Sequence, residues 1–245
     1  MEYFGITDKG KIRRENQDCF LMQEHGGADC VIGVLCDGMG GAKAGGLASD
    51  VASKAFIAYV DERLSEYSFK KPPYGNILTG ACAEANGVVY QYSCFDADYS
   101  GMGTTLVGVI AVKGRAFIVN VGDSRAYLVT PRRITQITRD HSLVEEMVRR
   151  GEITREEARN HPRKNIITNA LGLESGIKSD IFEVKLEKGD RILMCSDGVS
   201  NVIPDAQLLE ESLENERTQD FCRSIIDLAL DLNSPDNVTA AAIQA

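Results

Sequence analysis

Several short runs of consecutive apolar residues punctuate the chain, and each has a length typical of a β-strand. CVIGVLC at 30–36 and ILMC within 191–195 are wholly apolar, whereas EYFGIT near the start has the two-residue period of a strand. The pattern predicts strands at residues 2–7, 18–23, 30–36, 104–112, 115–121, 126–130, 133–138, 191–195 and 237–244.

Two longer stretches have helical periodicity instead. The first is expected from about Ala44 to Tyr67, and its apolar residues recur four positions apart, at Leu47, Val51, Ala55 and Tyr59. The second runs from about Pro73, a residue that suits a helix start, to Tyr92. Two shorter helices are expected at Gln207–Leu213 and Asp220–Leu230.

A mostly polar segment at 141–172 interrupts the strands. It contains a short helix, LVEEMVRR, which Gly151 closes, and a second helix from Thr154, where T-R-E-E is a capping-box sequence. No linker, repeat or low-complexity tract divides the chain, so residues 1–245 are expected to form a single domain.

The order of these elements predicts the fold class. Strands, two long helices, more strands, further helices and a last strand do not alternate as βαβ units do. They favour an α+β fold in four layers, α-β-β-α, with two mainly antiparallel sheets between layers of helices. A doubly wound parallel sheet remains the competing architecture.

Composition narrows the classes of partner. The net charge of −9 disfavours nucleic acid, and no apolar run approaches the roughly 20 residues needed to cross a membrane. The seven cysteines include no C-x-x-C pair, and the N-terminus does not resemble a signal peptide. We therefore expect a cytoplasmic protein whose cysteines are small buried residues in a reducing compartment.

Aspartates stand where apolar runs end. Asp37 follows VIGVLC, Asp123 follows FIVNVG, Asp197 follows ILMCS, and Asp236 precedes the last predicted strand. Asp-Gly is a common turn dipeptide, so turn formation is the alternative explanation for any one of these sites. Four acids that all adjoin apolar strands could instead converge on one edge of a sheet layer.

Converging carboxylates repel one another unless protons or cations neutralise them. The three histidines, His25, His141 and His161, lack the spacing of a zinc-ligand pair. An oxygen-only set of ligands suits Mg²⁺ or Mn²⁺, and clustered ions of this kind indicate phosphoryl chemistry.

The segment GKIRRENQD adds an anion-binding group. Arg13 suits bidentate contact with a phosphoryl group and Asp18 supplies another acid, while Arg14 is interpreted as a solvated surface charge. Two other chemistries are excluded. Neither Cys36 nor Cys195 is followed by five residues and an Arg, as a cysteine-dependent phosphatase requires. DGMGGAKAGG also lacks the Lys-Ser or Lys-Thr pair of a nucleotide-binding loop.

Seven ordered blocks resemble the type-2C protein phosphatases, the metal-dependent PPM family, in their bacterial stand-alone form. The blocks are GKIRRENQD, CDGMGG, GMGTTLVGV, VGDSRAYL, DHSLVEEMVRRGEITREEARNHPRKNIITNALG, CSDGVSN and PDNVT. They extend from residue 10 to residue 239 and so cover nearly the whole chain. The resemblance implies the α-β-β-α sandwich and hydrolysis of protein phosphoserine and phosphothreonine by a metal-activated water.

The resemblance also assigns roles to residues of the expected site. Asp37 would bridge two ions and the carbonyl of Gly38 would bind the second ion. Asp197 and Asp236 match the remaining ligands of the first ion, and Asp18 would act through a coordinated water. The cofactors implied are two or three Mn²⁺ or Mg²⁺ ions per chain.

Further roles concern the third ion and the substrate. Asp123 matches the acid that holds a third metal together with Asp197, and Arg13 matches the phosphate-binding arginine. The segment 141–172 matches the flap that borders the site. The expected partners are phosphorylated proteins, including a cognate serine/threonine kinase that this signalling enzyme opposes, and the expected state is a monomer.

One position departs from the family pattern. Many eukaryotic members have a proposed proton-donating histidine where this chain has Met39, and a thioether cannot donate a proton. A metal-bound water is the simplest replacement, and His141 and His161 in the flap are interpreted as structural or capping residues. Two alternatives stay open: a catalytically silent relative, which the complete set of acids disfavours, and a phosphatase of small phosphoesters.

Overall fold

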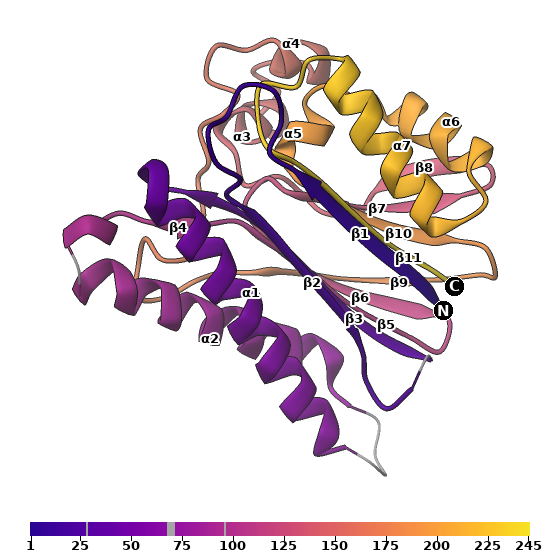
Figure 1. Ribbon diagram of the computed structural model, residues 1–245, viewed down its shortest axis with the longest axis horizontal. Helices are drawn as coiled ribbons and strands as arrows, with labels where there is room; N and C mark the ends of the chain where they lie inside the picture. Colours follow the sequence, from indigo (N-terminus) through magenta and orange to yellow (C-terminus); the bar gives the residue numbers. More distant parts are fainter. Residues whose placement is uncertain (28, 68–71, 96) are drawn as a thin grey trace.

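The computed structural model describes residues 1–245 apart from 28, 68–71 and 96, and it is built on two β-sheets stacked face to face (Figure 1). One sheet has the strand order β1-β11-β10-β7-β8, and the other has β2-β3-β5-β6-β9 with β4 paired to β3. All the strand pairings in the described part of the chain are antiparallel, so the doubly wound alternative is excluded.

The strands have the following bounds. The first sheet contains β1 (Glu2–Asp8), β11 (Val238–Gln244), β10 (Arg191–Cys195), β7 (Arg125–Thr130) and β8 (Arg133–Gln136). The second sheet contains β2 (Asp18–Glu24), β3 (Cys30–Met39), β5 (Leu106–Val112), β6 (Arg115–Val121) and β9 (Asp180–Lys185), with β4 at Gly103–Thr104.

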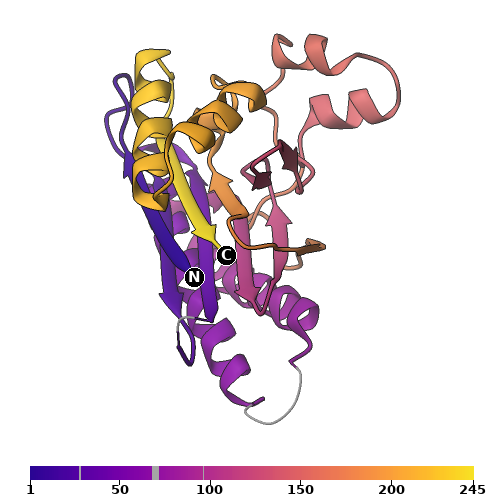
Figure 2. The ribbon, with the colours of Figure 1, turned by 90° about the vertical axis from the view of Figure 1, so that its right-hand side faces the viewer.

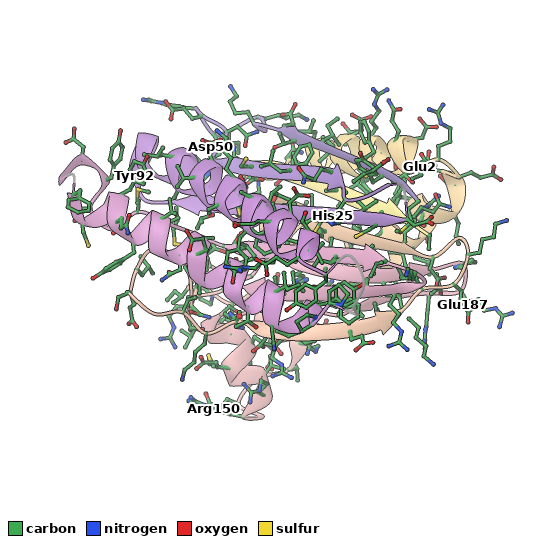
Figure 3. The ribbon with its side chains drawn as sticks, turned by 90° about the horizontal axis from the view of Figure 1, so that it is seen from below. Glu2, His25, Asp50, Tyr92, Arg150 and Glu187 are labelled. Carbon is green, nitrogen blue, oxygen red and sulfur yellow. The ribbon has the colours of Figure 1, made fainter. Side chains whose placement is uncertain are left out.

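Helices cover both outer faces (Figure 2). The second sheet is covered by α1 (Gly41–Ser65) and α2 (Tyr74–Phe95), and the first by α5 (Asp197–Ser200), α6 (Asp205–Glu214) and α7 (Thr218–Asp231). The 3₁₀ turn η1 (Ala97–Tyr99) follows α2. Two short helices, α3 (Leu143–Arg149) and α4 (Arg155–Arg159), lie in the flap, which projects from the body near Arg150 (Figure 3). The four-layer α-β-β-α prediction is confirmed.

Both faces of each central strand are buried, which explains the uninterrupted apolar runs. In β3, Ile32 and Val34 pack against the helices, whereas Val31 and Leu35 pack between the two sheets. β10 alternates in the same way between the helix-facing core and the inter-sheet core. A strand that is covered on both sides needs apolar residues at consecutive positions, even in an antiparallel sheet.

The structure corrects the bounds of several predicted elements and adds a strand that was not predicted. β3 continues to Met39 because Gly38 and Met39 pair with β4, so Asp37 lies within the strand and not in a turn after it. α1 begins at Gly41, earlier than expected, and β9 was not predicted because DIFEVK is short and half of its residues are charged. No helix in the described part of the chain is long and apolar enough to cross a membrane.

Candidate active site

Acids from both sheets meet at one end of the sandwich. The register of β2 against β3 places Asp18 directly opposite Asp37. Asp18 Oδ2 accepts hydrogen bonds from Ser196 Oγ at 2.8 Å and from Thr239 Oγ1 at 2.6 Å. Ser196 follows β10 and Thr239 belongs to β11, so this carboxylate joins the two sheets beside Asp197.

The glycines after two of the acids allow backbone segments to touch. A side chain at Gly38 would put its Cβ 2.0 Å from the carbonyl oxygen of Gly45 in α1. A side chain at Gly198 would put its Cβ 1.9 Å from the carbonyl oxygen of Asn237. These two Asp-Gly pairs therefore serve close packing, not turn formation. A turn is formed at Asp123, where the preceding Gly122 has a φ of 103°.

Burial gives the acids unusual proton affinities. Burial, followed by the charges of Asp18 and Asp197, raises the pKa of Asp37 well above its usual value. Burial is also the main reason that the pKa of Asp123 rises to about 8 and the pKa values of Asp18 and Asp197 rise to about 6. The Oδ1 atoms of Asp18, Asp123 and Asp197 are buried without a hydrogen-bond partner. Such oxygens are costly to bury, and an oxygen-only set of this kind fits hard divalent cations.

Among the described residues, the acids do not form a complete coordination shell. Within the described residues, no group of three or more Asp, Glu, His or Cys side chains surrounds one ion position. Asp236 Oδ2 instead accepts a hydrogen bond from Arg13 Nη2 at 2.6 Å, and Asp197 Oδ2 accepts one from Asn201 Nδ2 at 3.0 Å. Protein donors therefore hold one oxygen of Asp236 and one of Asp197, whereas Oδ1 of Asp197 has no hydrogen-bond partner.

Asn237 fixes the segment that carries Arg13, a role that the sequence did not reveal. Asn237 Nδ2 donates to the carbonyl oxygens of Lys9 at 2.8 Å and Glu15 at 3.0 Å, and its Oδ1 accepts from Gln17 N at 2.9 Å. The loop is thus tied at both ends to the residue after Asp236. In the sequence, Asn237 stands out only as part of the PDN block, which does not indicate what its side chain contacts.

A cleft of about 590 Å³ gathers most of the predicted residues. Its lining includes Arg13, Asp37, Gly38, Asp123, Asp197 and Asp236, together with Met39, Arg14 and the flap residues Asn165 and Ile167. Asp18, which lies opposite Asp37 on the neighbouring strand, does not line the cleft. No histidine lines it in the part of the chain that the structure describes, and His161 Nδ1 accepts from Arg163 N at 3.1 Å within the flap.

Comparison with known proteins gives matches along nearly the whole chain. Residues 12–241 match the family model described as protein phosphatase 2C. The serine/threonine phosphatase stp of Listeria monocytogenes is 37% identical over 239 residues, covering 97% of this chain and 93% of that protein. The protein phosphatase PhpP of Streptococcus pneumoniae is 33% identical over 244 residues, covering 99% and 97%.

Solved structures agree with these matches. The serine/threonine phosphatase Stp1 from Staphylococcus aureus has a TM-score of 0.86 at 35% identity, covering 100% of this chain and 94% of that one. The S. agalactiae serine/threonine phosphatase has a TM-score of 0.88 at 32% identity, with 98% of each chain covered. The catalytic domain of the phosphatase PstP, solved in complex with two manganese ions, has a TM-score of 0.83 at 32% identity, covering 98% and 96%.

Proposed function

The chain belongs to the protein phosphatase 2C family and is a serine/threonine protein phosphatase, and we propose how its own residues carry out the hydrolysis. The family is metal-dependent. The observation that supports the proposal is the cluster of buried aspartates with raised pKa values and unpaired oxygens beside the half-exposed Arg13.

We assign two ions to the carboxylates that line the cleft. Asp37 would contact both ions, and the Gly38 carbonyl would complete the set of the second. Asp197 and Asp236 would hold the first, while Asp18, opposite Asp37, would act through water. A third ion would be held by Asp123 with Asp197. Either Mn²⁺ or Mg²⁺ satisfies this oxygen-only set, and the relative solved with two manganese ions supports the first two sites.

The ions, the acids and Arg13 would each contribute differently to the hydrolysis. When bound, the ions polarise the phosphoryl group and lower the pKa of the attacking water. Asp37 and Asp123, whose pKa values are raised most, would have to release a proton to serve as ligands, since metal ligands must be deprotonated. Arg13 is half exposed and pairs with Asp236, so its guanidinium can exchange that partner for phosphoryl oxygens of the substrate.

We further propose that residues 1–245 act as one catalytic domain and as a monomer. The substrates are phosphorylated proteins, and a cognate serine/threonine kinase would be among them. A cytoplasmic location agrees with the seven cysteines, all of which are free thiols.

Hydrolysis of a phosphothreonine peptide with and without metal tests the proposal. Activity should vanish in EDTA and return with Mn²⁺ or Mg²⁺, while Zn²⁺ should replace them poorly. The same titration with p-nitrophenyl phosphate separates a protein phosphatase from an enzyme of small phosphoesters, which would turn over the aryl ester far better than the peptide. Full activity in excess EDTA would contradict the metal mechanism.

A further inference from the structure

His141, the first residue of the flap, is bonded to the turn that carries Asp123. The backbone N–H of His141 donates to the carbonyl oxygen of Gly122 at 2.9 Å. The N–H of Gly122 donates in return to His141 Nδ1 at 3.2 Å. Gly122 immediately precedes Asp123, so this reciprocal pair of hydrogen bonds bears on the direction in which Asp123 leaves β6.

The other end of the flap meets the same histidine. Thr168 N–H donates to the carbonyl oxygen of His141 at 2.8 Å, and Asn169 Nδ2 lies 3.1 Å from His141 Nδ1. A β-bridge between Ser142 and Ile167 lies next to these contacts. One residue therefore closes the base of the flap and contacts the Asp123 turn.

The hydrogen bonds define the state of the imidazole. Two N–H donors, from Gly122 and Asn169, point at Nδ1, so Nδ1 is an acceptor and the ring proton belongs on Nε2. Nε2 lies 3.4 Å from Asp180 Oδ2 in β9, which can accept that proton's hydrogen bond. The His141 side chain is 15% exposed, so the ring is held in place on most sides.

Neighbouring contacts hold the rest of this junction rigid. Asn120 Nδ2 donates to the carbonyl oxygens of Gly122 at 3.2 Å and Arg139 at 2.9 Å. Arg125 makes a bidentate contact with Asp140, with Nη2 2.7 Å from Oδ2. Residues 139–141 therefore make hydrogen bonds to the chain on both sides of Asp123. Of these contacts, the one at His141 Nδ1 is shared with Asn169 at the other end of the flap.

We propose that His141 is a positioning residue: its Nδ1 couples the closure of the flap to the orientation of Asp123, the acid assigned to the third ion. This role rests on the proposed function, because it gives Asp123 a metal to hold. A residue that orients a metal ligand from behind commonly changes metal affinity about 10- to 100-fold when it is lost. If the two ends of the flap separate at His141, the hydrogen bonds that orient the Asp123 turn are lost. Conversely, fixing the orientation of Asp123 favours the conformation in which the two ends of the flap meet at His141.

Three variants of His141 separate acceptor function from bulk. His141→Asn keeps an acceptor oxygen where Nδ1 stood, His141→Gln places its amide farther out, and His141→Leu has no acceptor. His161→Leu is the matched control, because His161 Nδ1 also accepts a backbone N–H but lies near Arg163, away from the Asp123 turn. The primary readout is amide hydrogen exchange at Gly122 and Thr168 in the metal-free protein, and the second is Mn²⁺ binding measured by calorimetry.

In His141→Leu and His141→Gln we expect faster exchange at both amides and roughly 10- to 100-fold weaker binding of the most weakly bound Mn²⁺. We expect His141→Asn and His161→Leu to stay close to wild type in both measurements. Wild-type exchange in His141→Leu, or an Asn variant as impaired as the Gln variant, would overturn the inference. If His141→Leu does not fold, the Asn and Gln variants decide it alone. An unchanged number of bound Mn²⁺ ions in Asp123→Ala would refute the assignment of a third ion to Asp123. The hydrogen-exchange result does not depend on that assignment.

Discussion

Asp37 is the acid most surrounded by others: the strand register sets it opposite Asp18, and the charges of Asp18 and Asp197 add to the effect of burial in raising its pKa. Asp37→Asn should lower turnover of a phosphothreonine peptide by more than about 100-fold, since even residues that merely support metal ligands cost 10- to 100-fold. The same change should raise the melting temperature of the metal-free protein near neutral pH, because an asparagine does not have to take up a proton on folding, as a carboxyl with a raised pKa does. Steady-state kinetics and thermal melts in EDTA measure the two effects.

Asp50→Asn is the matched control for this variant. Asp50 lies on the outer side of α1, where it pairs with Lys54 at 2.8 Å (Figure 3). Its loss should leave both turnover and the metal-free melting temperature near wild type, as expected for an exposed ion pair. A metal-free Asp37→Asn protein that melts well below wild type would contradict this account of the cluster.

Arg13 should contribute through the phosphoryl group alone. Arg13→Ala is expected to lower kcat/KM roughly 10- to 100-fold, the value of about 1.5–3 kcal/mol for a charge-assisted hydrogen bond, and to weaken inhibition by inorganic phosphate. Mn²⁺ affinity should stay nearly unchanged. Arg115→Ala removes a similarly exposed arginine from the pair with Glu183 and serves as the control. Equal kinetics in the two variants would make Arg13 a surface charge.

The sequence was sufficient to predict that four of the acids lie close together, but it could not predict the hydrogen-bond partners of the cluster. Asp37, Asp123, Asp197 and Asp236 could be found because each adjoins an apolar run. Ser196 and Thr239 reach Asp18 across 178 and 221 positions, and such contacts depend on how two sheets stack. Asn237 was predicted only as the first residue of the last strand, and its hydrogen bonds to the carbonyl oxygens of Lys9 and Glu15 likewise span more than 200 positions.

At the scale of elements, two glycines should respond to the same substitution with opposite sign. Gly198→Ala forces a Cβ to within 1.9 Å of the Asn237 carbonyl oxygen, so overpacking should cost about 1–3 kcal/mol. Gly87→Ala, inside α2 with nothing within 4 Å of the new Cβ, should stabilise the protein by roughly 0.5–1 kcal/mol. Urea unfolding of both metal-free variants measures the difference. A neutral Gly198→Ala would mean that α5 can shift away from Asn237 without cost.

The reliability of the predicted elements follows their burial. Central strands and long helices were predicted well, because a strand covered on both faces leaves a continuous apolar run. β9 was not predicted because it is a short edge strand with three charged residues, and no position in it is fully buried. The end of β3 was misplaced because its last pairing partner, β4, is only two residues long and lies far along the chain.

For the whole molecule, the raised pKa values predict how stability depends on pH. The folded pKa values of about 6 for Asp18 and Asp197 and about 8 for Asp123 exceed the ordinary value of 3.8. The folded state therefore holds more protons than the unfolded state across this range, and the metal-free protein should lose stability as pH rises from about 5 to 8. Each pKa unit corresponds to about 1.4 kcal/mol. Thermal melts in EDTA at stepped pH measure the slope.

Asp123→Asn should flatten that slope throughout the range of about pH 5 to 8, in which wild-type Asp123 holds a proton in the folded state but not in the unfolded state. Added Mn²⁺ should raise the melting temperature of wild type most at the high end of the range, because cations then compete with fewer protons. Parallel pH profiles for the metal-free wild type and Asp123→Asn would show that Asp123 titrates normally in the folded protein.

β11 is the last strand in the sequence yet lies inside its sheet, paired with β1 on one side and β10 on the other (Figure 1). It also supplies Thr239, and Asp236 precedes it. Until β11 has been synthesised, β1 and β10 therefore lack the strand that joins them, and the cleft lacks Asp236. We expect the site to assemble only after the chain has been made through β11, so that folding of the first sheet and completion of the acid cluster are a single late event.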